Sequence, residues 1–313
     1  KYGRQSRSCR SENGSLMENV SSLILPQRCL WKIQINPYLY DHHLEGRAVF
    51  PAAEAAIELA RVVKNNFPQA SVNNLTEASF PRFLSIPENA EEVTVSVNIE
   101  RGDGNGIAAS LLSTIASKAG NISRTVEHAR MKFARIVENQ CAAHPFNCVE
   151  KLDGECIHVP ATAIYHDLVP LGKAYRNISG DLTVSRAGAL GCISGGDAEA
   201  DDELLGSTFP FDAVLQMVCV WAQYFTDIVP FPVGFAQRII YQKTKKRSMY
   251  LGRIKPVTVA SPPFVFNAWI FDEQGTVCEA IQGIQMRDVS GGRRKPPAWI
   301  SEARSSERNL WES

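Results

Sequence analysis

Polar residues recur at helical spacing in an otherwise apolar stretch that follows Pro51. Glu54, Glu58, Arg61 and Asn65 have the i, i+4, i+7, i+11 spacing of one narrow stripe on a helix. Alanine, leucine and valine occupy most of the remaining positions. A helix that is apolar over most of its circumference must be largely buried. The pattern therefore predicts a long buried helix that begins after Pro51.

A second stretch, from Pro210 to about Phe225, shows the same organisation. Its polar residues are Asp212, Gln216 and Gln223, and nearly all the others are apolar. Pro210 fits the first turn of a helix, where its missing N–H has no intrahelical acceptor to lose. The sequence therefore predicts a second buried helix.

Strand patterns follow each predicted helix. Residues 93–99 alternate strictly between apolar and polar, which is typical of a half-buried strand. Further strands are predicted at 107–115, 125–137, 235–241, 249–254, 264–271 and 276–287. Residues 272–275 form the expected hairpin turn between the last two strands.

The chain thus divides into two similar halves, each with one buried helix and several antiparallel strands. A curved sheet wrapped around a helix satisfies this burial and gives an α+β fold. We expect a loose leader over 1–24, the first half over 25–140 and a linker over 141–156. The second half covers 157–290, and a C-terminal tail covers 291–313.

Composition and charge exclude some classes of protein. Hydrophobic residues make up 44% of the chain, and 33 basic residues balance 33 acidic ones. This balance argues against a nucleic-acid-binding protein, which normally carries a basic excess. No apolar run is long enough to predict a membrane span. The cysteines are sparse, and no two of them form a C-x-x-C motif, so we expect them to be free thiols. Free thiols are typical of a reducing compartment, and we therefore expect a cytoplasmic protein. A bridge within Cys141, Cys148 and Cys156 is the minor alternative.

Asp212 is the first candidate catalytic residue, because burial of a carboxyl on an apolar helix is unfavourable and suggests a functional role. At the expected helix start it would lie in the first turn, where the helix dipole favours the anion. Burial acts in the opposite direction and raises a carboxyl pKa. A carboxyl under both influences can serve as a general acid, although a purely dipole-related role is the alternative. Gln216, one turn later, could hold its rotamer by a hydrogen bond.

The second candidate is the segment 36–51, in which His42 and His43 precede Gly46 and the first helix. A histidine beside a buried helix can act as a base at a pocket, although a lone histidine is more often structural. Adjacent histidines point in different directions, and no carboxylate lies at a useful spacing. The segment therefore does not predict a metal site.

This segment resembles the H-P-x-L-x-D-H-x-x-x-G-x-x-x-x-P signature of polyketide synthase dehydratase domains. The matching positions are Pro37, Leu39, Asp41, His42, Gly46 and Pro51, with Asn36 in place of the first histidine. Residues 212–216 resemble the D-x-x-x-Q/H motif of the family. Residues 171–176 fall where the family has Y-G-P-x-F-R. The three motifs occur in the family's order, and the resemblance spans about 27–290.

The resemblance implies a double hot-dog fold, in which each half is a curved antiparallel sheet around a long helix. It implies a hydro-lyase that removes water from a 3-hydroxyacyl thioester carried on the phosphopantetheine arm of an acyl carrier protein. It implies no bound cofactor and no metal. Other synthase domains are further expected partners, and a homodimer is left open.

The resemblance also implies roles for single residues. His42 would be the base and Asp212 the acid, supported by Gln216, Gly46 and Pro51. Leu171, Gly172 and Tyr175 would line the substrate tunnel, and His43 would be structural. Backbone N–H groups between Gly46 and Ala52 would polarise the thioester oxygen.

Three positions depart from the family pattern. Leu171 replaces the usual tyrosine, Lys173 the proline, and Ala52 the glycine after Pro51. A product-template cyclase, a double-bond isomerase and an inactive carrier-binding module therefore remain alternatives. The cluster Lys243, Lys245, Lys246 and Arg247 is either a solvated turn or a docking site for an acidic carrier.

Overall fold

Two long helices form the centre of the two halves in the computed structural model. The structure describes residues 27–102, 106–116, 123–134, 151–198 and 204–300. Helix α1 (Ala52–Asn66) is rich in strong helix formers and begins after Pro51. Helix α3 (Thr208–Thr226) is buried over nearly its whole length. Both helices therefore need a surface that surrounds them.

Antiparallel strands supply that surface. The first half contains β1 (Gln27–Gln34), the 3-10 helix η1 (Pro37–Asp41), the short pair β2 (His43–Leu44) and β3 (Arg47–Ala48), then α1, β4 (Asn74–Ser79), β5 (Glu92–Arg101), β6 (Ile107–Ala116) and β7 (Ser123–Phe133). The second half contains β8 (Ile157–Pro160), α2 (Ala161–Ala163), the π-helical turn η3 (Ile164–Leu168), η4 (Lys173–Tyr175), β9 (Ile178–Ser185), β10 (Gly188–Ser194), α3, β11 (Phe231–Ile240), β12 (Met249–Thr258), β13 (Phe264–Phe271) and β14 (Val277–Arg287).

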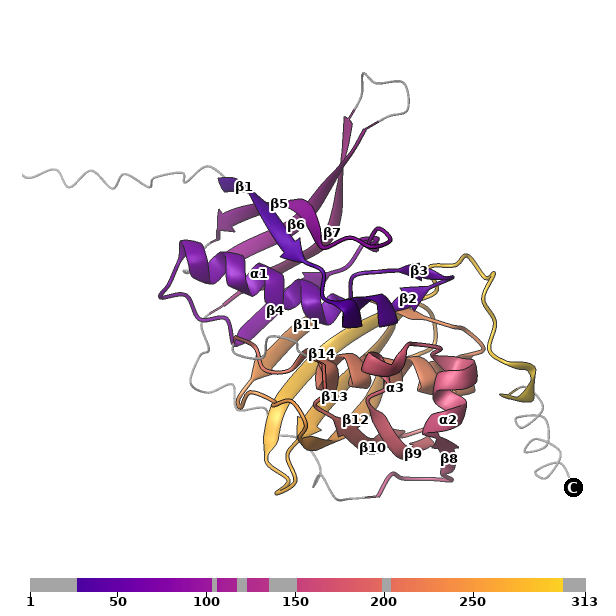
Figure 1. The fold of residues 1–313 in the computed structure, drawn as a ribbon. Coiled ribbons are helices and arrows are strands. Elements are labelled where there is room, and N and C mark those ends of the chain that lie inside the picture. The colour runs from indigo at the N-terminus through magenta and orange to yellow at the C-terminus, as the bar shows by residue number, and fades with distance from the viewer. Residues whose placement is uncertain (1–26, 103–105, 117–122, 135–150, 199–203, 301–313) are drawn as a thin grey trace, which may run out of the picture.

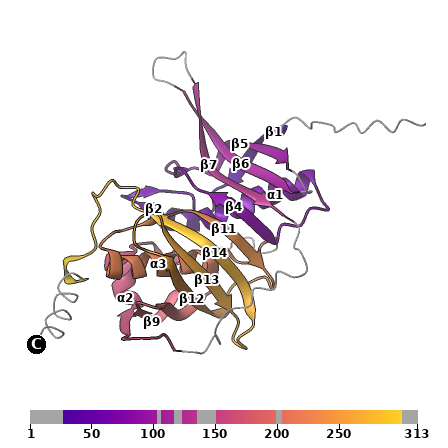
Figure 2. The same ribbon diagram turned by 180° about the vertical axis from the view of Figure 1, so that it is seen from behind.

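The described strands form one 12-stranded sheet in the order β1-β5-β6-β7-β4-β11-β14-β13-β12-β10-β9-β8. Strands β4 and β11 join the halves, with Leu75 opposite Arg238 and Ala78 opposite Phe235. Both helices lie on the same face of the curved sheet (Figure 1). Figure 2 shows the strands from behind, with the helices on the far side. The two halves thus share one continuous sheet and one core.

The structure agrees with most predicted elements and adds several. Helix α3 begins at Thr208, two residues before the expected start. Strands β1, β4, β8, β9 and β10 carry no clear alternation, and the sequence did not predict them. Strand β1 is an edge strand whose residues are mostly exposed, so its apolar periodicity is weak. Tertiary pairing, rather than local pattern, places these strands.

The first part of the expected tail is ordered against the second half. Ile300 is fully buried, and the Trp299 ring contacts Tyr224 with 5.8 Å between ring centroids. The Trp299 Nε1–H also donates to Asp167 Oδ2 over 3.2 Å. The apolar pair at 299–300 explains this contact, so these residues are not a loose linker.

The leader 1–24, residues 301–313 and most of the expected linker lie outside the described residues, and the proposed boundaries stay predictions.

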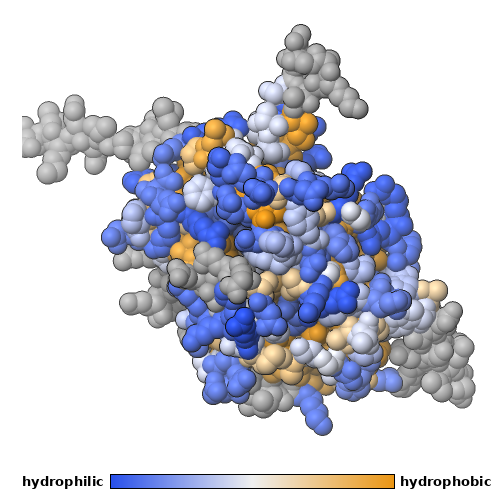
Figure 3. Space-filling view, in the orientation of Figure 1, coloured by the Kyte–Doolittle hydropathy of each residue, from blue (hydrophilic) through white to orange (hydrophobic). Residues whose placement is uncertain are grey.

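The surface agrees with the balanced composition. In the view of Figure 3, hydrophobic residues form small patches separated by hydrophilic ones. Among the described residues, no helix has both the length and the apolar character needed to cross a membrane.

Candidate active site

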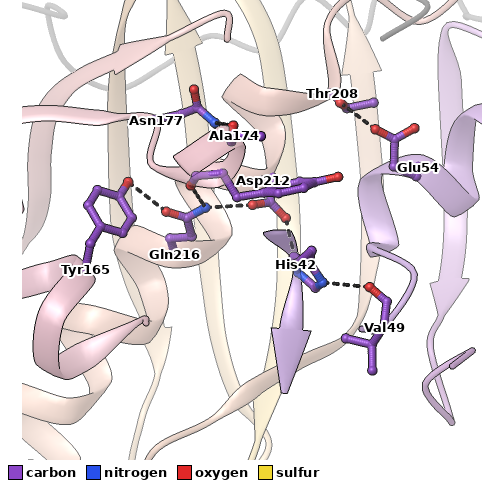
Figure 4. A network of polar contacts seen from close by, with 10 residues as sticks. His42, Val49, Glu54, Tyr165, Ala174, Asn177, Thr208, Asp212 and Gln216 are labelled. Atoms are coloured by element: carbon purple, nitrogen blue, oxygen red, sulfur yellow. Dashed lines mark hydrogen bonds and ion pairs between the residues drawn. The ribbon is translucent and has the colours of Figure 1, made fainter. Parts of the chain in front are cut away.

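His42 and Asp212 come from different halves and meet at one end of a cavity. His42 follows η1 directly, and Asp212 lies in the second turn of α3. The His42 Nε2 atom is 4.0 Å from Asp212 Oδ1, and the two side chains are 21% and 7% exposed. Figure 4 shows the two side chains facing each other. The separation is longer than a direct hydrogen bond, and both groups border the same cavity.

The peptide carbonyl of Val49 fixes the tautomer of His42. His42 Nδ1 lies 2.9 Å from Val49 O, and a carbonyl oxygen only accepts hydrogen bonds. Nδ1 therefore carries the proton, and the lone pair of neutral His42 is on Nε2. The same two residues also share a backbone bond, from Val49 N–H to His42 O over 2.9 Å. This arrangement presents a basic nitrogen towards Asp212.

Gln216 holds Asp212 in place through a chain of hydrogen bonds. Its Oε1 accepts from the Tyr165 hydroxyl over 3.0 Å, so its Nε2 faces the other way. Nε2 donates to Asp212 Oδ2 over 2.7 Å and to Tyr175 O over 2.9 Å. Tyr165 itself accepts from Ile178 N–H over 2.6 Å. The amide orientation of Gln216 is thus determined, and Asp212 Oδ1 is left facing His42 (Figure 4).

Burial raises the pKa of Asp212 above that of an ordinary aspartate. Nearby His42 and the hydrogen bond from Gln216 lower it, but burial is the largest influence. Because α3 begins at Thr208, Asp212 lies beyond the first turn, and the dipole contribution expected from the sequence is weak. The structure therefore favours a carboxyl that retains its proton more readily than usual.

The short hairpin β2–β3 positions the residues around His42. Gly46 lies in its turn with φ of +75°, a left-handed conformation that glycine adopts without strain. Pro51 precedes the first turn of α1 and has an extended backbone, with φ of −67° and ψ of 148°. The amides of Val49 and Phe50 already donate to His42 O and Leu84 O. Ala52, at the start of α1, has no intrahelical acceptor for its N–H and lines the cavity, so its N–H can face a thioester oxygen.

Two of the three expected tunnel residues lie behind the site rather than in its wall. Leu171 lines the cavity, but Gly172 and Tyr175 do not. Gly172 N–H donates to Asp41 O over 2.7 Å, and a Cβ on Gly172 would lie 2.3 Å from Asp41 Oδ1. Tyr175 is fully buried, with its ring centroid 5.1 Å from that of His42. Both residues support the segments that carry His42 and Asp212, because the 172–175 turn packs against them.

The structure adds cavity residues to those expected, and it differs from the structural role expected for His43. His43 lines the cavity beside His42, and apolar side chains cover much of the remaining wall. They are Phe50, Leu111, Leu215, Cys219, Phe231 and Pro232. A surface hollow continues the cavity and shares Phe80, Arg82, Phe83, His128 and Pro232 with it. Some of these residues lie in loops, whereas Leu111, His128, Leu215 and Cys219 lie inside β6, β7 and α3. Periodicity identifies such elements but does not show which of their residues border a cavity.

The cavity offers no evident metal centre. Among the described residues, no three histidine, cysteine, aspartate or glutamate side chains are grouped so as to hold a metal ion. The described cysteines, including Cys156, are free. Cys141 and Cys148 lie outside the described residues, so the minor alternative of a bridge between them stays a prediction.

Comparisons with known proteins show which family this chain resembles. Residues 16–114 match the family described as polyketide synthase dehydratase domain. A highly reducing polyketide synthase, tstA from Talaromyces stipitatus, is 26% identical over 257 residues, which cover 72% of this chain and 10% of the synthase. These matches confirm the resemblance to polyketide synthase dehydratase domains. The chain thus corresponds to about a tenth of the length of that synthase.

Solved dehydratase domains show the same fold. The dehydratase domain from the CurF module of curacin polyketide synthase is 18% identical, with a TM-score of 0.65 over 86% of this chain and 96% of that one. Two CurK dehydratase structures, both 18% identical, give TM-scores of 0.63 and 0.62 and cover 86% and 83% of this chain and 94% and 91% of theirs. Their titles describe inactive mutants, one with a histidine changed to phenylalanine and one with an aspartate changed to asparagine. The double hot-dog fold implied by the resemblance is therefore confirmed.

Proposed function

We propose that this chain removes water from a 3-hydroxyacyl thioester carried by an acyl carrier protein. The observation that carries the proposal is the opposition of His42 Nε2 and Asp212 Oδ1 across 4.0 Å beside an apolar cavity. The inactive CurK mutants, with a histidine and an aspartate replaced, agree with this pair of residue types. The reaction would take place within a larger cytoplasmic synthase and requires no cofactor.

The proposed reaction uses the protonation states that the contacts favour. Neutral His42 takes the α-proton at Nε2, and the electron pair of that C–H bond forms the new carbon–carbon double bond. The β-carbon–oxygen bond breaks, and Asp212 donates its proton to the leaving hydroxide, which departs as water. The proton on His42 then returns to Asp212 before the next turnover. The Ala52 N–H stabilises the developing charge on the thioester oxygen.

The continuous hollow suggests how the carried substrate enters. Arg82 lines both the cavity and the hollow, and Arg124 lines the hollow alone, beside the exposed side chains of Phe83, Ile115 and Val289. A phosphopantetheine arm is uncharged along its length and carries a phosphate at the end attached to the carrier. The apolar wall fits the arm, and an arginine suits its phosphate. We therefore place the carrier at this opening.

This position replaces the basic cluster at 243–247 as the expected docking site. Lys243 lines a different hollow with Lys64, at the C-terminal end of α1. Ala52 and Ala55, at the N-terminal end of the same helix, line the catalytic cavity. Arg247 also approaches Asp197, with 3.6 Å between Nε and Oδ1. The cluster thus lies at another part of the surface than the cavity, which favours the opening as the position of the carrier.

The test is incubation of the purified chain with a 3-hydroxyacyl pantetheine thioester, with the products separated by mass spectrometry. We expect an enoyl thioester that has lost one water, and no product with His42→Phe or Asp212→Asn. A cyclised product or a shifted double bond would favour the cyclase or the isomerase. Carrier binding without turnover would favour an inactive module.

A further inference from the structure

Glu54 is a buried carboxyl that the proposed reaction does not use. It belongs to the polar stripe on α1, and it is 6% exposed beside Ala53 and Ala55. Carboxyls are rarely buried unless their hydrogen-bonding capacity is met, because desolvation of the charge is costly. The hydrogen bonds of Glu54 should therefore explain why this carboxyl is buried.

Glu54 Oε1 accepts hydrogen bonds from both catalytic segments. The Tyr38 hydroxyl donates to it over 3.1 Å, and the Thr208 hydroxyl donates over 3.0 Å. Tyr38 belongs to η1, which ends one residue before His42. Thr208 is the first residue of α3, one turn before Asp212. Figure 4 shows the Glu54–Thr208 bond close to the His42–Asp212 pair.

Aromatic packing connects these contacts to the histidine ring. The Tyr38 ring centroid lies 6.2 Å from that of Tyr175 and 5.8 Å from that of Phe209. The Tyr175 ring lies against His42, with 5.1 Å between centroids. A shift of Tyr38 would therefore be passed to His42 through close-packed rings, since protein interiors leave little free space.

We propose that Glu54 is a positioning residue that sets the separation of His42 and Asp212 by accepting hydrogen bonds from Tyr38 and Thr208 at one oxygen. The inference rests on the proposed function only for its effect on turnover. The structural part, a fixed distance between the two side chains, can be measured without substrate. Without Glu54, the buried Thr208 hydroxyl and the half-buried Tyr38 hydroxyl would lose this acceptor, and each segment would rearrange on its own.

Two substitutions separate the role of Glu54 as a hydrogen-bond acceptor from the role of its negative charge. Glu54→Gln keeps an oxygen that can accept both hydroxyl bonds, and Glu54→Leu removes it at similar volume. We expect Glu54→Leu to lower kcat at least about tenfold with KM nearly unchanged, because an ångström of misplacement is costly in a proton-transfer site. Glu54→Gln should keep kcat within about threefold of the wild type.

Glu58 provides a matched control on the same helix. It is equally buried at 6% exposure, and it accepts from Trp31 Nε1 over 2.7 Å and from Arg61. None of these partners belongs to the segments that carry His42 and Asp212. Glu58→Leu should therefore lower stability without a selective loss of kcat.

A second readout does not depend on turnover. In the folded protein, Asp212→Asn should change the ¹⁵N chemical shifts of the His42 ring, because the carboxyl lies 4.0 Å from Nε2. We expect this change to shrink by half or more in the Glu54→Leu background and to persist in the Glu54→Gln and Glu58→Leu backgrounds.

The outcomes distinguish this inference from the proposed function. An undiminished His42 response in folded Glu54→Leu would overturn the positioning role, whatever the activity. A diminished response in a chain whose wild type shows no dehydration would support the positioning role and refute the proposed reaction. If Glu54→Leu does not fold, the paired variants Tyr38→Phe and Thr208→Val test the same bonds. Lack of any effect of that pair on the His42 response would overturn the inference.

Discussion

The Nε2 atom of His42 and the Oδ1 atom of Asp212 lie 4.0 Å apart although they belong to different halves of the chain. In each side chain, the polar atom that points away from the other residue is held by a hydrogen bond. Val49 O accepts from His42 Nδ1, and Gln216 Nε2 donates to Asp212 Oδ2. The two remaining polar atoms therefore face the cavity. Such preorganisation is what an acid–base pair requires, because little reorientation is needed during proton transfer.

Replacement of His42 should abolish dehydration without unfolding the chain. His42→Ala removes the base, and because His42 borders a cavity on one side, only part of its surface packs against other residues. We expect turnover to fall by about a hundredfold or more, with a thermal melting curve near that of the wild type. Wild-type turnover by this variant would exclude His42 as the base.

Asp212 should be more sensitive than its partner Gln216. Asp212→Asn can still accept a hydrogen bond but cannot deliver a proton, and we expect a loss on the order of a hundredfold to ten-thousandfold in kcat. Gln216→Glu keeps the shape but places a second carboxyl beside Asp212, where the amide now donates over 2.7 Å. We expect it to shift the pH profile and cost less in rate. Equal activity of Asp212→Asn and the wild type would exclude the acid role.

Glu54 should give the protein a pH-dependent stability. Burial raises the pKa of Glu54 from 4.5 to about 7, while hydrogen bonds from Thr208 and Tyr38 and the nearby Arg61 lower it and Glu58 raises it. The unfolded chain therefore ionises at this position from about pH 4.5, and the folded chain only from about pH 7. Over that interval the unfolded state binds fewer protons, so this contribution to stability is full below pH 4.5 and is lost as the pH rises to 7.

Urea unfolding of the wild type and Glu54→Gln at pH 5 and pH 8 measures this effect. Glutamine cannot ionise, so the variant should gain stability relative to the wild type as the pH rises. A difference in unfolding free energy that is equal at both pH values would contradict a raised pKa at Glu54.

The entrance proposed for the carrier can be tested with two arginines. Arg82→Ala or Arg124→Ala should raise KM for a phosphopantetheine-linked substrate by about tenfold, which corresponds to about 1.4 kcal/mol of lost binding. A pantetheine thioester without the phosphate should be affected little. Lys245→Glu, in the basic cluster away from the cavity, is the control. A larger effect of Lys245→Glu than of either arginine variant would return the docking site to the basic cluster.

The ion pair between Arg238 and Glu279 should dominate the stability of the second half. Arg238 Nε donates to Glu279 Oε2 over 2.7 Å with both side chains buried, and the Arg238 guanidinium lies 4.0 Å from the centre of the Phe211 ring. Glu279→Ala leaves the arginine without its carboxylate and should cost about 3–5 kcal/mol. Glu92→Ala breaks the exposed pair with Lys32 and should cost much less, because water screens that pair. Chemical denaturation of both variants gives the comparison, and equal costs would contradict it.

The sequence by itself determined the elements whose burial leaves a local pattern. Both long helices and the strands β5, β6, β7 and β11–β14 could be predicted, because the spacing of apolar residues reflects which face of an element is buried. The motifs around His42 and Asp212 also indicated the family and the candidate pair. Strands β9 and β10 were missed because their residues carry no regular alternation, and their pairing partners fix them instead.

Only the tertiary structure decided how those residues act together. The carbonyl of Val49, the hydroxyl of Tyr165 and the carboxyl of Glu54 acquire their roles through contacts between segments far apart in the chain. The same packing puts Gly172 and Tyr175 behind the site and separates the basic cluster from the cavity. A periodic pattern describes one element at a time, whereas the position of a polar atom at the junction of two halves depends on the register and packing of both.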